Sequence, residues 1–349
     1  MIKQCTPQEA PKEEELKQRL QKAQEKLAGQ QMLLKEHKLP VIVLVEGWGA
    51  AGKGGAIGSM IKNLDPRFFK VATMSEPTEA EIRRPFLYRY FVQIPEAGKL
   101  VFLDSGWGDE VTKKRMKGEL TEEEYKARVE SIKRFERQLT DNGYLVIKLF
   151  FHISQKQQKK RLKELEENKD TAWRVSELDK WQNKHYEKYL EIFDDYLRDT
   201  NASTAPWYLV DAGSAKWAAL QSLEILCDGI DVALVNERLA VPLLQNTFPL
   251  VKMPKLSEVA LDKTMEEAEY RKELHHLQEK LRKLHYRLYR KKIPVIITYE
   301  GWDAAGKGGN IKRVAGALDP RGYEVHPIAS PEPHEKARHY LWRFWTRLP

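Results

Sequence analysis

The chain has 349 residues, enough for one large domain or two ordinary ones, with 42% hydrophobic and 32% charged residues, as in a soluble globular protein. Its net charge of +8 favours polyanionic partners, although solvated charge on long helices explains such a surplus equally well. The sequence contains no apolar run of membrane-spanning length, no signal peptide and no nucleic-acid-reading motif, so we expect neither a membrane nor nucleic acid as a partner.

The first predicted elements are a helix, a strand and a glycine-rich turn. Residues 13–37 carry apolar side chains at helical spacing, and the β-branched run 41–45 predicts a buried strand. The turn at 46–55 has the pattern Gly-x4-Gly-Lys after a strand, which is the context of a phosphate-binding P-loop. Its glycines let backbone N–H groups surround phosphate oxygens. The candidate phosphate-binding residues are Gly47, Gly52, Lys53, Gly54 and Gly55.

The helix after the loop ends at Leu-Asp-Pro-Arg, residues 64–67, because proline cannot continue it. A short strand, a turn at Pro77 and an aromatic helix over 86–90 follow. Arg84 lies in this helical stretch, and an arginine fork matches phosphate oxygens. A solvated charge is an equally good interpretation of Arg84, and both stay open.

Strands and helices alternate through the rest of the first half. Strands are predicted over 99–104, 145–152 and 206–210, and helices over 121–142, 155–168, 173–200 and 216–231. This alternation predicts an α/β fold, a P-loop NTPase-like parallel sheet covered by helices. Asp104 ends one apolar strand, where an acid holds Mg²⁺ beside a P-loop, although such an acid also serves as a helix cap.

The first arm of the chain is repeated. Residues 16–95, the first repeat, align without a gap with residues 270–349, the second repeat. A repeat of this length indicates two homologous domains, so we expect the second copy to repeat a strand over 294–298 and a short strand before a turn at Pro331. We expect a first domain over 1–240, a linker over 241–265 and a second domain over 266–349. The second copy stops before a counterpart of the strand that ends in Asp104, so we expect its sheet to be incomplete and marginal alone.

The second loop has Lys307 at the lysine position and Asp303 where the first loop has Gly49. A carboxylate in the loop can reach a cation shared with phosphate oxygens, so we expect Asp303 and Asp104 to be metal ligands. Each arm then holds one half of a metal site. The remaining candidates are Gly301, Gly306, Gly308 and Gly309 for phosphate binding, and Arg338 and Arg343 for catalysis with Asp303 and Lys307.

These residues resemble the polyphosphate kinase type 2 family, and most closely its tandem-domain branch of polyphosphate:AMP phosphotransferases. The resemblance rests on the loop at 300–309, the Leu-Asp-Pro-Arg sequences, Tyr-Leu-Trp-Arg-Phe at 340–344, and Phe-His-Ile-Ser at 151–154 with Arg161. It implies phosphoryl transfer between inorganic polyphosphate and a nucleotide, AMP to ADP, with Mg²⁺ as cofactor.

In that family the loop Asp, the loop Lys and an Asp-Arg-Ser-Trp strand motif carry the chemistry. Asp303 and Lys307 match the first two. In the first domain the motif begins at Asp104 but has Ser105 in place of arginine, and the loop acid is Gly49. The resemblance therefore implies a non-catalytic first domain and a second domain that breaks off before its strand motif, so we expect this chain to be weak or inactive.

Two other functions remain open on the sequence. One is a non-catalytic polyphosphate-binding or assembly domain, and the other is an ATP-dependent nucleoside monophosphate kinase. The oligomeric state is also open, a homo-oligomer included. Cys5 and Cys227 follow no disulfide or metal-binding pattern, which favours the reducing cytoplasm.

Overall fold

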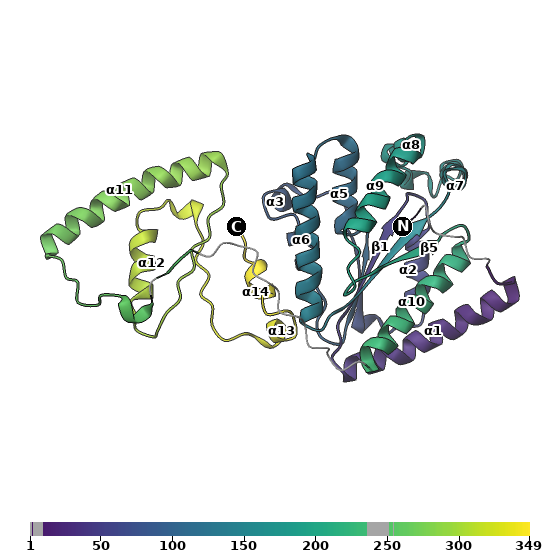
Figure 1. Ribbon diagram of the computed structural model, residues 1–349, viewed down its shortest axis with the longest axis horizontal. Coiled ribbons are helices and arrows are strands. Elements are labelled where there is room, and N and C mark those ends of the chain that lie inside the picture. The colour runs from purple at the N-terminus through teal and green to yellow at the C-terminus, as the bar shows by residue number, and fades with distance from the viewer. Residues whose placement is uncertain (1, 3–9, 236–250, 254) are drawn as a thin grey trace. The chain divides into compact units, whose positions relative to one another are not determined.

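The computed structural model describes residues 2, 10–235, 251–253 and 255–349 (Figure 1). The chain divides into two compact units. Unit 1 contains Met1–Val241 together with Glu332–Thr346, and unit 2 contains Pro242–Pro331 together with Arg347–Pro349. Part of the predicted linker, residues 241–250 and 254, lies outside the described residues.

Unit 1 is built on a five-stranded parallel sheet with the order β2-β3-β1-β4-β5. Its strands are β1 (Val41–Gly47), β2 (Phe69–Thr73), β3 (Leu100–Asp104), β4 (Leu145–His152) and β5 (Trp207–Asp211). The central β1 is apolar and buried from Val41 to Val45, as a strand covered on both faces requires. The chain places β2 and β3 on one side of β1 and β4 and β5 on the other, so the P-loop after β1 lies at the switch point where α/β sheets bind ligands.

Helices form a layer on each face of this sheet (Figure 1). One layer contains α1 (Glu13–Glu36), α2 (Lys53–Ile61) and α10 (Ala215–Val235), and the other contains α5 (Trp107–Lys117), α6 (Glu122–Asp141) and α9 (Tyr186–Asp199). Further helices are α3 (Glu79–Ile82), α4 (Tyr88–Phe91), α7 (Gln155–Glu167) and α8 (Glu177–Lys184). The arrangement confirms the predicted α/β fold. The helix expected over 173–200 is divided into a 3₁₀ turn, α8 and α9.

The second repeat contributes α11 (Glu267–Lys291), α12 (Lys307–Ala315), a 3₁₀ turn at Pro320–Gly322, α13 (Pro333–Lys336) and α14 (Trp342–Trp345). The strands predicted over 294–298 and before Pro331 were wrong, since the described residues form no strand there and Ile296 is 62% exposed. In the first repeat the equivalent segment is β1, which pairs with β3 and β4. No strand that could pair with residues 294–298 occurs among the described residues of unit 2. No described helix is long and apolar enough to cross a membrane.

One piece of the second repeat, Glu332–Thr346, groups with the first unit. The guanidinium of Arg338 lies 2.9 Å from the carboxylate of Glu96, and the ring centroids of Phe91 and Trp345 are 3.4 Å apart. Phe91 and Trp345 are equivalent positions of the two repeats, so α4 and α14 meet through the same face. The predicted boundaries placed this segment with the second domain, whereas the structure groups it with unit 1.

Candidate functional site

The first P-loop connects β1 to α2 through a backbone that glycine makes accessible. Gly47 has φ 128° and Gly52 has φ 89°, with Ala50 at φ 56° between them. A Cβ on Gly47 would lie 2.3 Å from the carbonyl oxygen of Phe151 on the neighbouring β4. Gly52 is the N-cap of α2, whose first-turn N–H groups have no intrahelical acceptors and form an anion-binding end.

Lys53 folds back over this loop. Its Nζ donates to the carbonyl oxygens of Trp48 at 2.9 Å and Gly47 at 3.3 Å. Gly54 and Gly55 follow in the first turn of α2, where nothing lies within 4 Å of an added Cβ. The structure thus brings the predicted phosphate-binding residues of the first loop together around one turn, while Arg84 lies elsewhere, against Tyr88.

The second P-loop repeats this backbone. Gly301, Ala304 and Gly306 have φ values of 151°, 58° and 82°. Lys307 Nζ donates to the carbonyl oxygens of Trp302 at 2.6 Å and Gly301 at 2.9 Å. The two remaining predicted glycines lie in the first turn of α12, namely Gly308 and Gly309. Because this loop forms without flanking strands, its shape follows from its own sequence.

The two predicted acids lie in different units. Asp104 ends β3, directly opposite Val45 in the sheet register. Burial raises the pKa of Asp104, the nearby Lys53 ammonium opposes that rise, and the charge of Asp109 adds to it. Asp303 lies in the second loop, exposed, with its Oδ1 accepting a hydrogen bond from Ala304 N at 3.2 Å.

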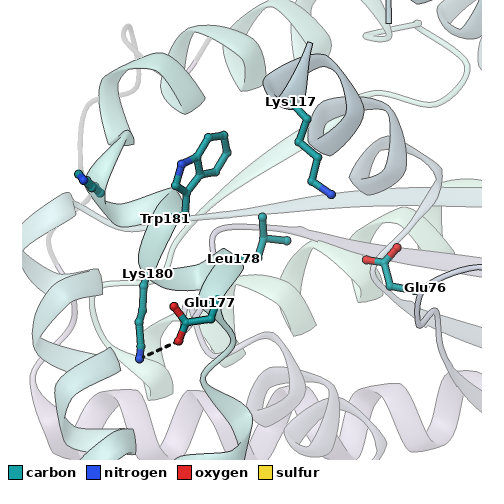
Figure 2. A pocket seen from close by; sticks show the side chains of 7 residues that line it. Glu76, Lys117, Glu177, Leu178, Lys180 and Trp181 are labelled. Carbon is teal, nitrogen blue, oxygen red and sulfur yellow. Dashed lines mark hydrogen bonds and ion pairs between the residues drawn. The ribbon is translucent and has the colours of Figure 1, made fainter. Parts of the chain in front are cut away.

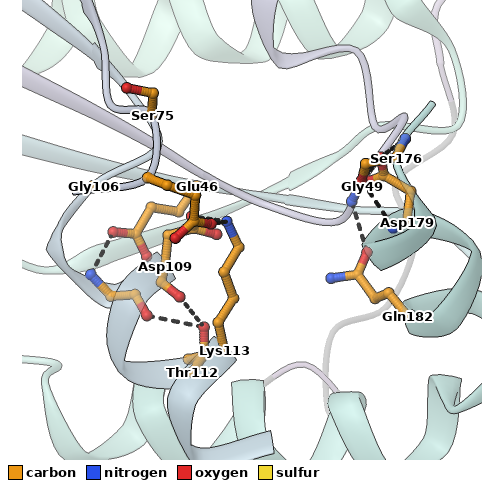
Figure 3. A network of polar contacts seen from close by, with 12 residues as sticks. Glu46, Gly49, Ser75, Gly106, Asp109, Thr112, Lys113, Ser176, Asp179 and Gln182 are labelled. Carbon is orange, nitrogen blue, oxygen red and sulfur yellow. Dashed lines mark hydrogen bonds and ion pairs between the residues drawn. The ribbon is translucent and has the colours of Figure 1, made fainter. Parts of the chain in front are cut away.

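Helix α8 covers the first P-loop at Gly49 (Figure 3). Gly49 N donates to Gln182 Oε1 at 2.8 Å, and Gln158 Nε2 on α7 donates to Gly49 O at 3.2 Å. A Cβ on residue 49 would lie 2.1 Å from Asp179 Oδ1. A side chain at the position that carries Asp303 in the second repeat would therefore require Asp179 to move in the first.

Sequence reasoning missed this contact between α8 and the loop. Asp179 lies 130 residues after Gly49, so residue spacing did not connect the two. A local signal was present, since Ser176 and Asp179 form a capping box that fixes where α8 begins. That signal locates the helix in the chain but does not say what the helix covers.

Trp48 is part of the core. It is fully buried, it stacks on Tyr186 with ring centroids 4.0 Å apart, and its Nε1 donates to His152 Nδ1 at 3.0 Å. Burial lowers the pKa of His152, so the ring is held neutral and accepts this hydrogen bond. Its counterpart Trp302 is 85% exposed in unit 2.

Arg161 is a further loop contact to which the sequence assigned no role. Its Nη1 donates to the carbonyl oxygens of Ala50 and Ala51, and its Nη2 donates to those of Ala212 and Gly213 after β5. Burial lowers its pKa. The guanidinium therefore ties the P-loop to the neighbouring loop of the sheet.

The predicted arginines are engaged by aromatic rings and acids. The Arg84 guanidinium lies 4.5 Å from the ring centroid of Tyr88, and Arg338 lies 4.6 Å from that of Trp342. These are equivalent pairs in the two repeats. The partly buried guanidinium of Arg343 lies 3.4 Å from a carboxylate oxygen of Glu335. The roles of these arginines in phosphate binding and catalysis stay predictions.

Helices α5 and α8 border an open pocket of about 640 Å³ (Figure 2). Its lining includes Trp181 and Leu178 with a rim of charged residues, namely Glu76, Lys117, Glu177, Lys180 and Lys184. The basic residues of α5 are largely matched by acids, as in the ion pair of Lys113 with Asp109 at 2.6 Å.

The donor set for a metal is small. The described residues contain no group of three or more His, Cys, Asp or Glu side chains that could hold a metal ion. Mg²⁺ bound together with phosphate chains needs only one or two carboxylates, because phosphate oxygens and water complete its shell. Asp104 in unit 1 and Asp303 in unit 2 each fit that limited role.

Comparison with known proteins agrees with this geometry. The family model of polyphosphate kinase 2 matches residues 10–238 and 264–349. The chain belongs to the polyphosphate kinase 2 family. It is 33% identical over 329 residues to a polyphosphate:AMP phosphotransferase of Pseudomonas aeruginosa, covering 93% of this chain and 66% of that protein. The chain spans less than two thirds of the length of this relative and of a second one from Pseudomonas syringae.

Other family members share parts of the chain. An AMP/ADP-polyphosphate phosphotransferase of Meiothermus ruber is 32% identical over 197 residues, covering 56% of this chain and 72% of that protein. A crystal structure described as polyphosphate kinase 2 from Pseudomonas aeruginosa superposes with a TM-score of 0.82 at 29% identity, covering 100% of this chain and 69% of that one. The family match therefore extends over most of the chain and is not confined to the loop motif.

Proposed function

We propose that this chain takes part in phosphoryl transfer between inorganic polyphosphate and a nucleotide, with AMP as acceptor and ADP as product. The observation that carries the proposal is the pair of P-loops with matching backbones, each with a lysine folded over it. Two such turns, each leading into a helix N-terminus, suit a ligand with many phosphate groups. Relatives named for the same reaction support this assignment.

In this proposal the chain's own residues bind and neutralise phosphate. Backbone N–H groups of each loop hold phosphate oxygens, and Lys53 and Lys307 turn their ammonium groups from loop carbonyls to the bound chain. Asp104 and Asp303 would hold Mg²⁺, which neutralises charge on the transferring phosphoryl group when it is bound. We place this activity in the cytoplasm, following the cysteine usage.

Weak or absent turnover by this chain is part of the proposal. The first domain has Asp104 at the end of β3 but Gly49 in its loop, whereas the second loop has Asp303. Phosphoryl transfer depends on positioned charge, so a loop with one carboxylate binds phosphate better than it transfers it.

An assay of ADP formation from AMP with polyphosphate and Mg²⁺ tests the assignment. We expect slow turnover that Lys307→Ala abolishes, together with calorimetric binding of polyphosphate. Absence of both binding and turnover would refute it. Donor competition separates the alternative of an ATP-dependent monophosphate kinase, because that enzyme would prefer ATP to polyphosphate.

A second candidate function is a non-catalytic polyphosphate-binding domain in unit 1. It is favoured by the contact of α8 with Gly49, because the Asp179 side chain occupies the place next to the loop where an acid at position 49 would begin. In that case polyphosphate binds, Lys53→Ala weakens binding, and no condition yields turnover by the first repeat.

A further inference from the structure

Both P-loops are preceded by a glutamate, Glu46 and Glu300, that the proposed function does not use. Glu46 ends the apolar part of β1 and is only 5% exposed. No ion pair joins it to another side chain within the described residues. A buried carboxyl group without a charged partner is costly, so its contacts indicate what it does.

Glu46 contacts the turn between β3 and α5 (Figure 3). Its Oε1 accepts a hydrogen bond from Gly108 N at 2.9 Å, and a Cβ on Gly106 would lie 2.4 Å from the same atom. Just before this contact, Ser105 N donates to Val45 O at 3.1 Å. The side chain of Glu46 therefore extends the pairing of β1 with β3 beyond the end of the sheet.

This hydrogen bond replaces the N-terminal cap that α5 lacks in its own sequence. The N-cap of α5 is Gly106, which has no side chain to accept from the first turn. An N-cap side chain normally accepts from the second or third helical residue, and Gly108 is the second residue of α5. Glu46 thus caps α5 from the P-loop strand.

The turn is held from two further sides. Tyr90 on α4 donates through its hydroxyl to Gly106 O at 2.8 Å. Gly108 lies against Tyr196 on α9, where an added Cβ would be 2.2 Å from the ring. Ser105 adopts φ 69°, a conformation that a non-glycine residue keeps only when its surroundings impose it. The start of α5 is therefore fixed by contacts from other elements.

We propose that Glu46 is a positioning residue, which caps α5 from the P-loop strand and so fixes Asp104 and α5 relative to the first phosphate loop. This inference rests on the proposed function for the role of Asp104 and α5 near phosphate. The capping itself is a structural claim that can be tested separately. Its charged surroundings are Asp109 on α5, Glu136 on α6 and Lys148 on β4.

The test compares Glu46→Gln and Glu46→Ala in the full chain. Gln keeps an acceptor oxygen at the right length, whereas Ala leaves Gly108 N without one. We expect Ala to speed hydrogen exchange at the start of α5 about tenfold relative to the α6 amides, and Gln to stay near wild type. Calorimetry with tripolyphosphate and Mg²⁺ should show about tenfold weaker binding for Ala and little change for Gln.

The matched control is Glu300→Ala, which changes the same motif where the residue is exposed and should leave α5 unaffected. If Glu46→Ala does not fold, Glu46→Asp takes its place, because the shorter acid cannot reach Gly108 N. An equal rise in exchange across the whole sheet, or no change at α5, overturns the proposal. Failure of the wild type to bind tripolyphosphate would instead refute the proposed function, while the exchange data still judge the cap.

Discussion

The two P-loops have the same backbone and very different surroundings. The first loop follows a buried strand and is covered by α8. The second loop follows residues 294–298, which form no strand and are exposed. Both nevertheless fold their lysine onto the same two carbonyl positions. The loop shape is therefore a local property, while the space available to a loop acid is set by distant elements. Substitutions at matched positions can separate these two contributions.

The largest difference is expected at the first glycine of each loop. Gly47→Ala combines a left-handed φ with a clash against β4, so we expect it to lower the free energy of unfolding of unit 1 by about 4 kcal/mol. Gly301→Ala meets no atom within 4 Å and should cost about 1 kcal/mol, from the backbone alone. Hydrogen exchange of β1 under urea measures the first effect. Equal effects at both glycines would show that the sheet adds nothing.

A smaller effect is expected where the repeats meet. Trp345→Ala removes a half-buried ring from Phe91, so we expect a loss of about 2 kcal/mol and faster exchange over Glu332–Thr346. Trp302→Ala is the matched control, since that ring is 85% exposed. Unchanged exchange over the segment would contradict the assigned packing.

The next test concerns the loop position at which the repeats differ, Gly49 in the first and Asp303 in the second. Gly49→Ala forces Asp179 away and disturbs the hydrogen bond to Gln182, so we expect unit 1 to lose about 2 kcal/mol. The reciprocal change, Asp303→Gly, should leave stability within about 0.5 kcal/mol, because Asp303 is exposed. Thermal unfolding of both variants decides. If Gly49→Ala were neutral, α8 would not be the reason for glycine at this position.

The last prediction concerns the dependence of stability on pH, which the glutamate before the first loop should influence. Burial raises the pKa of Glu46 to about 8, with Asp109 adding to the rise and Lys148 opposing it. Between about pH 4.5 and 8 the unfolded chain releases a proton that the folded chain keeps, so stability falls as pH rises, by at most about 1.4 kcal/mol per unit. Glu46→Gln should flatten this decline in denaturant midpoints. An identical pH profile in the variant would show that other groups cause it.

The sequence alone predicted the elements whose signals are local. The strand at 145–152 and the P-loop glycines were predicted from a short apolar run and a fixed spacing, and the structure has both. Residues 294–298 have the same apolar pattern as β1, so the pattern alone could not show that only β1 forms a strand. The difference is that β1 has neighbouring strands to pair with. Propensity suggests a strand, but neighbouring strands form it.

Other parts of the candidate site depend on contacts between remote residues. Nothing near Gly49 in the sequence indicates that Asp179 occupies the adjacent space, and nothing near Gly106 indicates that Glu46 replaces its missing cap. The ion pair of Arg343 with Glu335 was also missed, although the two lie eight residues apart. Each of these arrangements is decided by how elements pack, which residue spacing does not encode.

A turn whose form is written into ten consecutive residues has a particular evolutionary advantage. It can be copied elsewhere in a gene and keep its backbone shape without the strands that flank the first copy. Each copy can then change by mutation without losing the shape of the turn, as Gly49 in one loop and Asp303 in the other illustrate. Duplication followed by specialisation is thus an easy route for a motif of this kind.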